Sequence, residues 1–185
     1  MRLDKVKQAL GARVEFRWKS YALLMGRADP RLVTPHSRTS RVAAAEAEPE
    51  ARFEPWAADK PYISSSLPAL EAAKCAAAQG AQAFESYHRA LFRAMFAESI
   101  DISDYASLSV LAAREGLDAD RFRKDLDAGR NKTAVIGEHL EMVVEHGEAP
   151  SGLPLVLIEG REPIVGAAPA DLYLRILQRA LAGRG

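Results

Sequence analysis

Cysteine is almost absent from this sequence. Cys75 is the single cysteine among 185 residues, which excludes an internal disulfide and a metal site built from several cysteine ligands. Glu-Ala-Ala-Lys precedes it and three alanines follow it, so it falls in the middle of a predicted helix. The expected role of such a cysteine is that of a buried structural thiol.

Long apolar runs, an excess of charge of one sign and glycine-rich phosphate loops are absent as well. No stretch reaches the roughly 18 apolar residues of a membrane-spanning helix. The formal net charge of +0 gives no global field that would attract nucleic acid. The N-terminal residues lack the apolar core and cleavage site of a secretory signal. We therefore expect a cytoplasmic protein with no membrane partner, no nucleic-acid partner and no cofactor.

Apolar periodicity predicts an α/β protein in which helices outnumber strands. The alternation Val-Glu-Phe-Arg-Trp at 14–18 indicates a half-buried strand. Two apolar runs at 155–158 and 164–165 flank a tight turn, as in a hairpin. Between these strands, an irregular connection over 21–62 leads into a run of helices. The predicted helices cover 2–10, 69–79, 81–97, 133–146 and the residues from 169 onward, with two more capped by 101–104 and 117–120.

The apolar faces of these helices predict the core. Residues of helix 133–146 that share a face are Ile136, Leu140 and Val143, and in the last helix they are Leu174, Leu177 and Leu181. Helix 81–97 carries the widest stripe: Phe84, Tyr87, His88, Leu91, Phe92, Met95 and Phe96. Core packing is the expected role of all three faces.

A proline stands directly before the hairpin. Leu153-Pro154 precedes the predicted strand at 155–158. Taken alone, this dipeptide fits a trans proline at the first position of a strand, because proline cannot donate a hydrogen bond to a ladder. An X-Pro bond is also the one place where a cis peptide bond is inexpensive.

Several short pieces, in order along nearly the whole chain, resemble the DsbA-like thioredoxin family, in particular its FrnE-like and 2-hydroxychromene-2-carboxylate isomerase-like branch. The pieces are residues 14–19, 69–74, 87–94, 101–104, 112–118 and 151–154. The resemblance implies a thioredoxin-like fold with an all-α helical insertion. Its core would comprise 1–62 and 133–185, and the insertion 63–132.

The same resemblance implies a site. Pro154 corresponds to the cis-proline of the family, and Gly152 and Leu153 lie where relatives present the backbone of a substrate. That substrate would be a protein or peptide thiol, or glutathione. The Val-Pro-Thr of the family is Leu-Pro-Leu here, so Leu155 replaces a polar residue.

The chain departs from the family at the reacting groups. Relatives begin with a strand and a Cys-x-x-Cys or serine site at a helix N-terminus, but this sequence starts near the end of that helix and has no Cys-x-x-Cys. We therefore predict no catalytic residue and no redox activity for this chain on its own. Without the first strand of the family, 14–18 and 155–158 would each keep an unpaired edge. A misplaced gene start, a partner or homodimer at these edges, and a rearranged sheet remain as explanations.

Two other functions stay open: a non-catalytic peptide-binding or chaperone-like module, and a relative of glutathione-dependent isomerases. Arginines at 27, 31, 38 and 41 beside His36 fit a solvated loop, or else a site for an anion such as a glutathione carboxylate. Serines 64–66 fit a helix cap better than a catalytic serine. His139 and His146 are seven residues apart, a poor spacing for a metal site.

Overall fold

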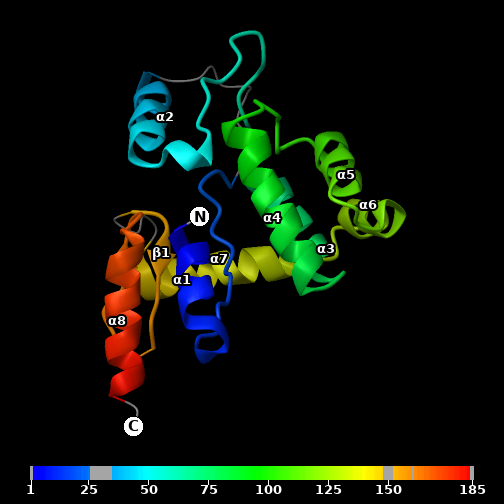
Figure 1. Cartoon of the computed structure of the whole chain (residues 1–185). Helices are drawn as coiled ribbons and strands as arrows, with labels where there is room; N and C mark the ends of the chain where they lie inside the picture. The colour runs from blue at the N-terminus through cyan, green and yellow to red at the C-terminus, as the bar shows by residue number, and fades with distance from the viewer. Residues whose placement is uncertain (1, 26–34, 148–151, 160, 184–185) are drawn as a thin grey trace. The chain divides into compact units, whose positions relative to one another are not determined.

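The computed structural model describes residues 2–25, 35–147, 152–159 and 161–183, and Figure 1 shows its elements. The chain forms two compact units. The hairpin unit comprises Met1–Lys19 and Leu140–Gly185, and the helical unit comprises Ser20–His139. The division at 62/63 and 132/133 that the sequence suggests stays a prediction. Within the described ranges, no helix is long and apolar enough to cross a membrane.

The hairpin unit is built from two complete helices, the end of α7 (Lys132–His146) and a hairpin. Its elements are α1 (Arg2–Leu10), a 3-10 turn (Gly11–Arg13), β1 (Leu155–Val156), β2 (Ile164–Val165) and α8 (Ala170–Ala182). The strands are antiparallel, with Leu155 opposite Val165 and Val156 opposite Ile164. Helix α1 packs against α8, and the core consists of Val6, Leu10, Ala168 and Tyr173. The structure confirms the predicted helix over 2–10 and the hairpin.

Segment 14–18 differs from its prediction as a strand. Val14 has extended torsion angles, φ −136° and ψ 127°, but the described sheet contains β1 and β2 alone. The predicted alternation is present over 14–17, where Val14 and Phe16 are half-buried against the core of the hairpin unit and Glu15 and Arg17 are exposed. It fails at Trp18, which is 41% exposed. Alternation of apolar and charged residues predicts which side chains are buried. It does not predict a strand, because a strand also needs a second backbone with which to form hydrogen bonds.

The first strand of the hairpin is shorter and less buried than predicted. β1 spans two residues in place of the four at 155–158, and Leu157 is 50% exposed. Val156 and Ile164 pack against the core, but Val165 is 45% exposed. A continuous apolar run is typical of a strand that is buried on both faces. In this hairpin one face packs against the core and the other is partly exposed to solvent.

The helical unit contains α2 (Pro35–Ala47), a 3-10 turn (Pro49–Ala51), α3 (Leu67–Ala77), α4 (Ala81–Phe96), α5 (Tyr105–Arg114), α6 (Ala119–Asp127) and the first part of α7 (Lys132–His146). Helices α3, α4, α5 and α6 pack together (Figure 1). Their core combines alanines with a few large side chains, such as Tyr87, Leu108 and Phe122. Alanine at a contact lets two helix axes approach closely, and α3 and α4 share the most extensive such contact.

Helix starts in this unit follow the capping residues in the sequence. Asp104 accepts a hydrogen bond from the Ser107 amide at 2.8 Å, and Asp118 accepts one from the Arg121 amide at 3.0 Å. Both caps were predicted. Among serines 64–66 the capping bond comes from Ser65, whose hydroxyl accepts from the Leu67 amide at 3.2 Å, whereas Ser66 makes no side-chain capping bond. Instead its hydroxyl accepts from the Leu24 amide at 3.2 Å.

Two predicted core faces are wrong in part. On α4, Tyr87 and Leu91 are buried together with Ala90 and Ala94, but Phe92 is 54% exposed. On α7 the buried residues are Val135 and His139, and Leu140 is 52% exposed. Close approach at small residues decides the covered face of α4, so Tyr87 is its one fully buried aromatic residue, and Phe84, Phe92 and Phe96 lie at the border of the contact. In the last helix Tyr173 is the buried residue, and the predicted Leu174 and Leu177 are partly buried against the same core.

Candidate functional site

The loop before β1 holds the three predicted site residues, Gly152, Leu153 and Pro154. The Leu153–Pro154 peptide bond is cis. The Pro154 carbonyl accepts a hydrogen bond from the Gly166 amide at 2.9 Å, and the Gly166 carbonyl accepts from the Tyr173 hydroxyl at 3.3 Å. Tyr173 is 2% exposed. The end of β2 and the core of α8 therefore fix the backbone of this loop.

Side chains of the loop differ in their surroundings. A Cβ atom on Gly152 would lie 3.0 Å from Val165 Cγ1, so glycine permits the loop to approach β2 closely. Leu153 is half-buried and Pro154 is exposed. In the described part of the chain, the main-chain amide and carbonyl of Leu153 make no hydrogen bond. The loop thus offers a peptide unit that can pair with the backbone of a ligand. Ser151, the other residue of the predicted motif, lies outside the described residues.

The Cys75 thiol is too buried to act as the nucleophile of a thiol–disulfide exchange. It belongs to the helical unit and is 1% exposed. Burial raises the pKa of its thiol, although the Asn131 side-chain amide donates a hydrogen bond to Sγ at 3.3 Å and opposes this effect. The nearby carboxylates of Asp125 and Glu71 raise the pKa further. The predicted reading as a buried structural thiol is confirmed.

The predicted arginine patch is wrong at Arg41. This side chain is 6% exposed, and its guanidinium donates to the carbonyls of Met95, Phe96 and Glu54, each at 3.1 Å. It also lies over the Trp56 ring, 5.6 Å from the centroid. Arg41 therefore caps the C-terminus of α4, where the helix dipole favours a cation. Arg27, Arg31 and the side chains of His36 and Arg38 lie outside the described residues.

Buried polar groups in the helical unit escaped the sequence analysis. Glu71 is 3% exposed; burial raises the pKa of its carboxyl, which Lys132 and a hydrogen bond from Tyr105 lower in turn. Partial burial also raises the pKa of the half-buried Glu138. Hydrogen bonds from Lys74 at 2.5 Å and from the Ser20 amide at 2.7 Å together outweigh this effect, so the pKa of Glu138 is lowered. Both carboxylates stand on helices at positions that a hydropathy pattern assigns to solvent.

His139 is buried for a structural reason. It is 8% exposed, its Nδ1 lies 3.4 Å from the Ala22 amide, and its ring lies 4.9 Å from that of Tyr21. It thereby holds the start of the long connection against α7. Across the described ranges, no group of three or more potential ligands is arranged to hold a metal ion.

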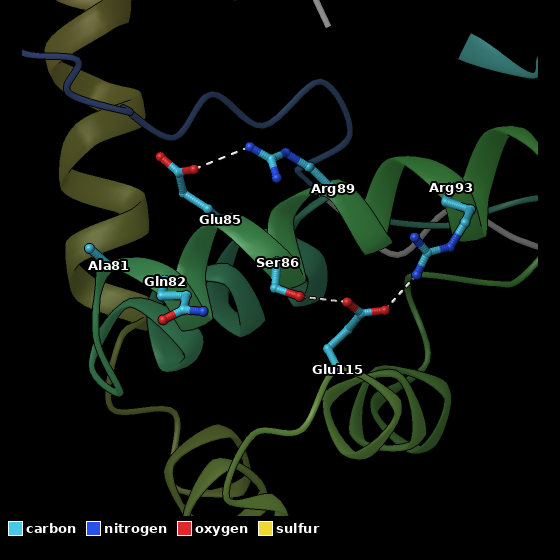
Figure 2. Close-up of a pocket in the computed structure, with 7 residues that line it drawn as sticks. All are labelled: Ala81, Gln82, Glu85, Ser86, Arg89, Arg93 and Glu115. Carbon is cyan, nitrogen blue, oxygen red and sulfur yellow. Dashed lines mark hydrogen bonds and ion pairs between the residues drawn. The ribbon is translucent and has the colours of Figure 1, made fainter. Parts of the chain in front are cut away.

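A hollow on the surface of the helical unit is lined by polar side chains that form ion pairs with each other (Figure 2). Arg89 pairs with Glu85 at 3.2 Å, and Arg93 pairs with Glu115 at 2.5 Å. The Ser86 hydroxyl donates to the same Glu115 carboxylate at 2.6 Å. Because opposite charges already meet inside the hollow, it offers little to a charged ligand.

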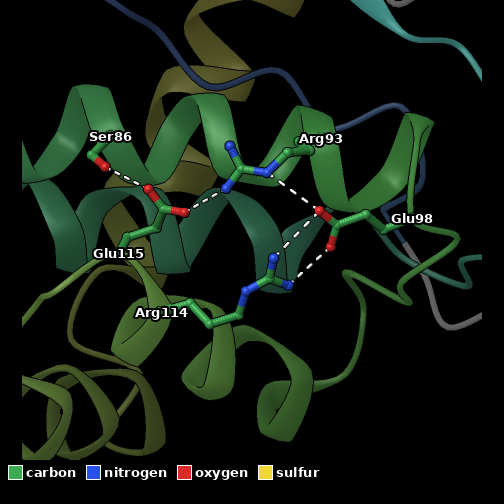
Figure 3. Close-up of polar contacts among 5 residues, drawn as sticks. All are labelled: Ser86, Arg93, Glu98, Arg114 and Glu115. Atoms are coloured by element: carbon green, nitrogen blue, oxygen red, sulfur yellow. Dashed lines mark hydrogen bonds and ion pairs between the residues drawn. The ribbon is translucent and has the colours of Figure 1, made fainter.

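The same network ties α4 to the end of α5 (Figure 3). Arg93 also contacts Glu98 at 3.3 Å, and Arg114 donates to Glu98 at 2.9 Å. The hydrogen bond from Arg114 is the main cause that lowers the pKa of Glu98. We interpret this row of charges as a structural link between the two helices. The loop 152–154 therefore remains the candidate site.

A hairpin followed by a helix, with a helical unit inserted earlier in the chain, matches the order of elements expected for the later part of a thioredoxin-like fold with a helical insertion. The family model of the DSBA-like thioredoxin domain matches residues 1–178. The chain belongs to this family, which confirms the predicted fold class. A solved structure, that of a candidate protein disulfide isomerase from Nitrosomonas europaea, has a TM-score of 0.73 and 18% identity, with 100% of this chain and 90% of that chain covered. No curated protein matches the chain.

Proposed function

We propose that this chain binds an extended protein or peptide segment at loop 152–154 and, on its own, performs no dithiol–disulfide exchange. Membership of a thiol–disulfide oxidoreductase-like family supports the class of ligand. The burial of Cys75 carries the second half of the proposal, because this thiol is the single one in the sequence and is 1% exposed.

Thiol–disulfide exchange needs a thiolate that reaches the disulfide of the substrate. A second thiol then releases the product from the mixed disulfide. Cys75 is enclosed by the core of the helical unit, and burial raises the pKa of its thiol. The chain therefore supplies neither an accessible attacking thiolate nor a resolving thiol.

Binding requires only main-chain groups and a suitable surface. At Leu153, the peptide unit makes no hydrogen bond to any described residue, and the adjoining carbonyl of Pro154 is held by Gly166. An extended ligand can pair with such a fixed backbone, while alternate side chains of the ligand contact the surface on either side. The resemblance to the family supports a role in substrate presentation for the same residues.

An insulin-reduction assay tests the redox half of the proposal. We expect no acceleration of the dithiothreitol-driven reaction, and the same rate for the wild-type chain and for Cys75→Ala. Turnover clearly above the uncatalysed rate that disappears in Cys75→Ala would contradict the proposal.

Nuclear magnetic resonance tests the binding half, with the reduced and carboxymethylated insulin B chain as an unfolded peptide. We expect amide shifts at Gly152, Leu153 and Gly166, and no shift at Arg123 of α6, which is exposed on the other unit. Shifts confined to the helical unit, or none at millimolar peptide, would show that the loop is not the binding site.

The glutathione-dependent alternative has less support. Of its predicted anion-binding arginines, Arg41 is committed to three main-chain carbonyls. We expect no heat of binding for millimolar glutathione in calorimetry, and saturable binding would restore this alternative.

A further inference from the structure

At the centre of segment 14–18, Glu15–Arg17 lack the main-chain partners that a strand requires, as far as the described residues extend. Within the described residues, the amides and carbonyls of Glu15, Phe16 and Arg17 make no main-chain hydrogen bond. Backbone polar groups that are unpaired within a chain bind water or a second chain. An extended segment of this kind is a template for an added strand.

The two faces of this segment have opposite character. Val14 and Phe16 are half-buried against the core of the hairpin unit, and the Lys7 ammonium lies 5.4 Å from the centroid of the Phe16 ring. Glu15 and Arg17 lie on the other face and bind each other, with Nε–Oε1 and Nη2–Oε2 distances of 2.9 and 3.1 Å. Their side chains are 71% and 78% exposed. One acid and one base, two positions apart, thus stand on an exposed face.

This pattern is complementary to itself when the direction of the strand is reversed. In an antiparallel pair centred on Phe16, Glu15 lies directly opposite Arg17 of a second copy, and Arg17 lies opposite Glu15 of that copy. Opposite charges at directly facing positions stabilise an antiparallel pair, whereas like charges destabilise it. A parallel pair in register would place Glu15 against Glu15 and Arg17 against Arg17.

We propose that segment 14–18 pairs antiparallel with the same segment of a second copy of this chain, about a twofold axis at Phe16. We assign the partner strand to a second copy of the chain because Glu15 and Arg17 of one copy are complementary to Arg17 and Glu15 of the other. This homodimer is independent of peptide binding at loop 152–154, so the failure of one proposal leaves the other intact.

Charge reversal tests the pairing. Glu15→Arg and Arg17→Glu each bring like charges together at two symmetric positions, and each is expected to weaken dimerisation at least tenfold in sedimentation velocity. Both side chains are exposed, so circular dichroism should remain that of the wild-type chain. The double variant Glu15→Arg/Arg17→Glu restores the match and should dimerise like the wild-type chain.

Mixing the two single variants separates this contact from the ion pair within one chain. The intrachain Glu15–Arg17 pair is lost in both variants, but a mixed dimer places two arginines opposite two glutamates. We expect the mixture to form a heterodimer although neither variant dimerises alone. A monomeric wild-type chain at submillimolar concentration, or single variants that dimerise as well as the wild-type chain, would overturn the proposal.

Cysteine cross-linking tests the register. A mixture of Glu15→Cys and Arg17→Cys chains should form a disulfide-linked heterodimer under mild oxidation, because these positions face each other in the proposed pair. Either variant alone should cross-link far more slowly, and Cys75 contributes no background because it is 1% exposed. Cross-linking that is equally fast in each variant alone would exclude this register and overturn the twofold arrangement at Phe16.

Discussion

Replacement of Arg41 by methionine tests whether this buried cation holds the helical unit together. The guanidinium makes three hydrogen bonds of 3.1 Å, two of them to the last carbonyls of α4. Hydrogen bonds from a charged donor contribute about 1.5–3 kcal/mol each, a gross value of roughly 4.5–9 kcal/mol. Desolvation of the guanidinium offsets several kcal/mol of this value. We therefore expect Arg41→Met to lower the free energy of unfolding by about 3 kcal/mol.

Urea unfolding followed by circular dichroism measures this loss. For an m-value of about 2 kcal/mol/M, the expected change shifts the midpoint by roughly 1.5 M. Arg123→Met is the matched control, because Arg123 pairs with Asp127 at 3.4 Å on an exposed face. Its expected loss is below about 0.5 kcal/mol. Arg41→Lys should fall between the two, since lysine keeps the charge but lacks the planar fork.

A small effect of Arg41→Met on stability would refute the capping role of this side chain. If Arg41→Met loses less than about 1 kcal/mol, or no more than Arg123→Met, then the carbonyls of Met95 and Glu54 find water as readily as they find Arg41. In that case the guanidinium packs against Trp56 without acting as a helix cap.

Three further changes have defined outcomes. Glu71→Gln should raise the free energy of unfolding at pH 7 but not at pH 4. Burial raises the pKa of Glu71 in the folded state. The wild-type chain therefore loses stability as the pH rises from the unfolded-state pKa of Glu71 through its folded-state pKa. Gly152→Ala should cost about 1–2 kcal/mol, since its Cβ would meet Val165 Cγ1 at 3.0 Å, and Val165→Ala in the same chain should recover most of the loss. Asp104→Ala should cost about 1 kcal/mol at pH 7. That difference should disappear as the pH falls through the pKa of Asp104 in the folded state, which the hydrogen bond from the Ser107 amide holds below its ordinary value. Urea titrations at the stated pH values check all three.

Most helix boundaries were predictable because local residues determine them, but α2 (Pro35–Ala47) lies within the connection 21–62 that the sequence analysis described as irregular. Helix α1 ends at Leu10 before Gly11, and α4 begins at Ala81 after Gly80, whose φ of +123° few other residues adopt. Asp104 and Asp118 cap their helices as the sequence indicated. Such signals act over one turn of chain, so they are readable without knowledge of the tertiary fold.

Burial depended on contacts that the sequence does not show. His139 is covered because the connection after Ser20 returns to α7, and Arg41 is covered because the end of α4 meets α2. Both residues read as solvent-facing or ambiguous in a hydropathy pattern. The partner of each is 54 to 117 residues away in the sequence, so local periodicity carries no information on it.

Strand pairing was harder to predict from the sequence than helix boundaries, and it bears on the proposed function. Segment 14–18 has the alternation of a strand, but an alternation does not supply a second backbone. The hairpin unit consequently presents main-chain groups at Glu15–Arg17 and at Leu153 that make no hydrogen bond to any described residue. Pairing at such groups uses peptide units and alternate side chains, and it requires no thiol. A member of this family whose single thiol is buried therefore retains two positions for extended backbone, one that we assign to a ligand and one to a second copy of the chain.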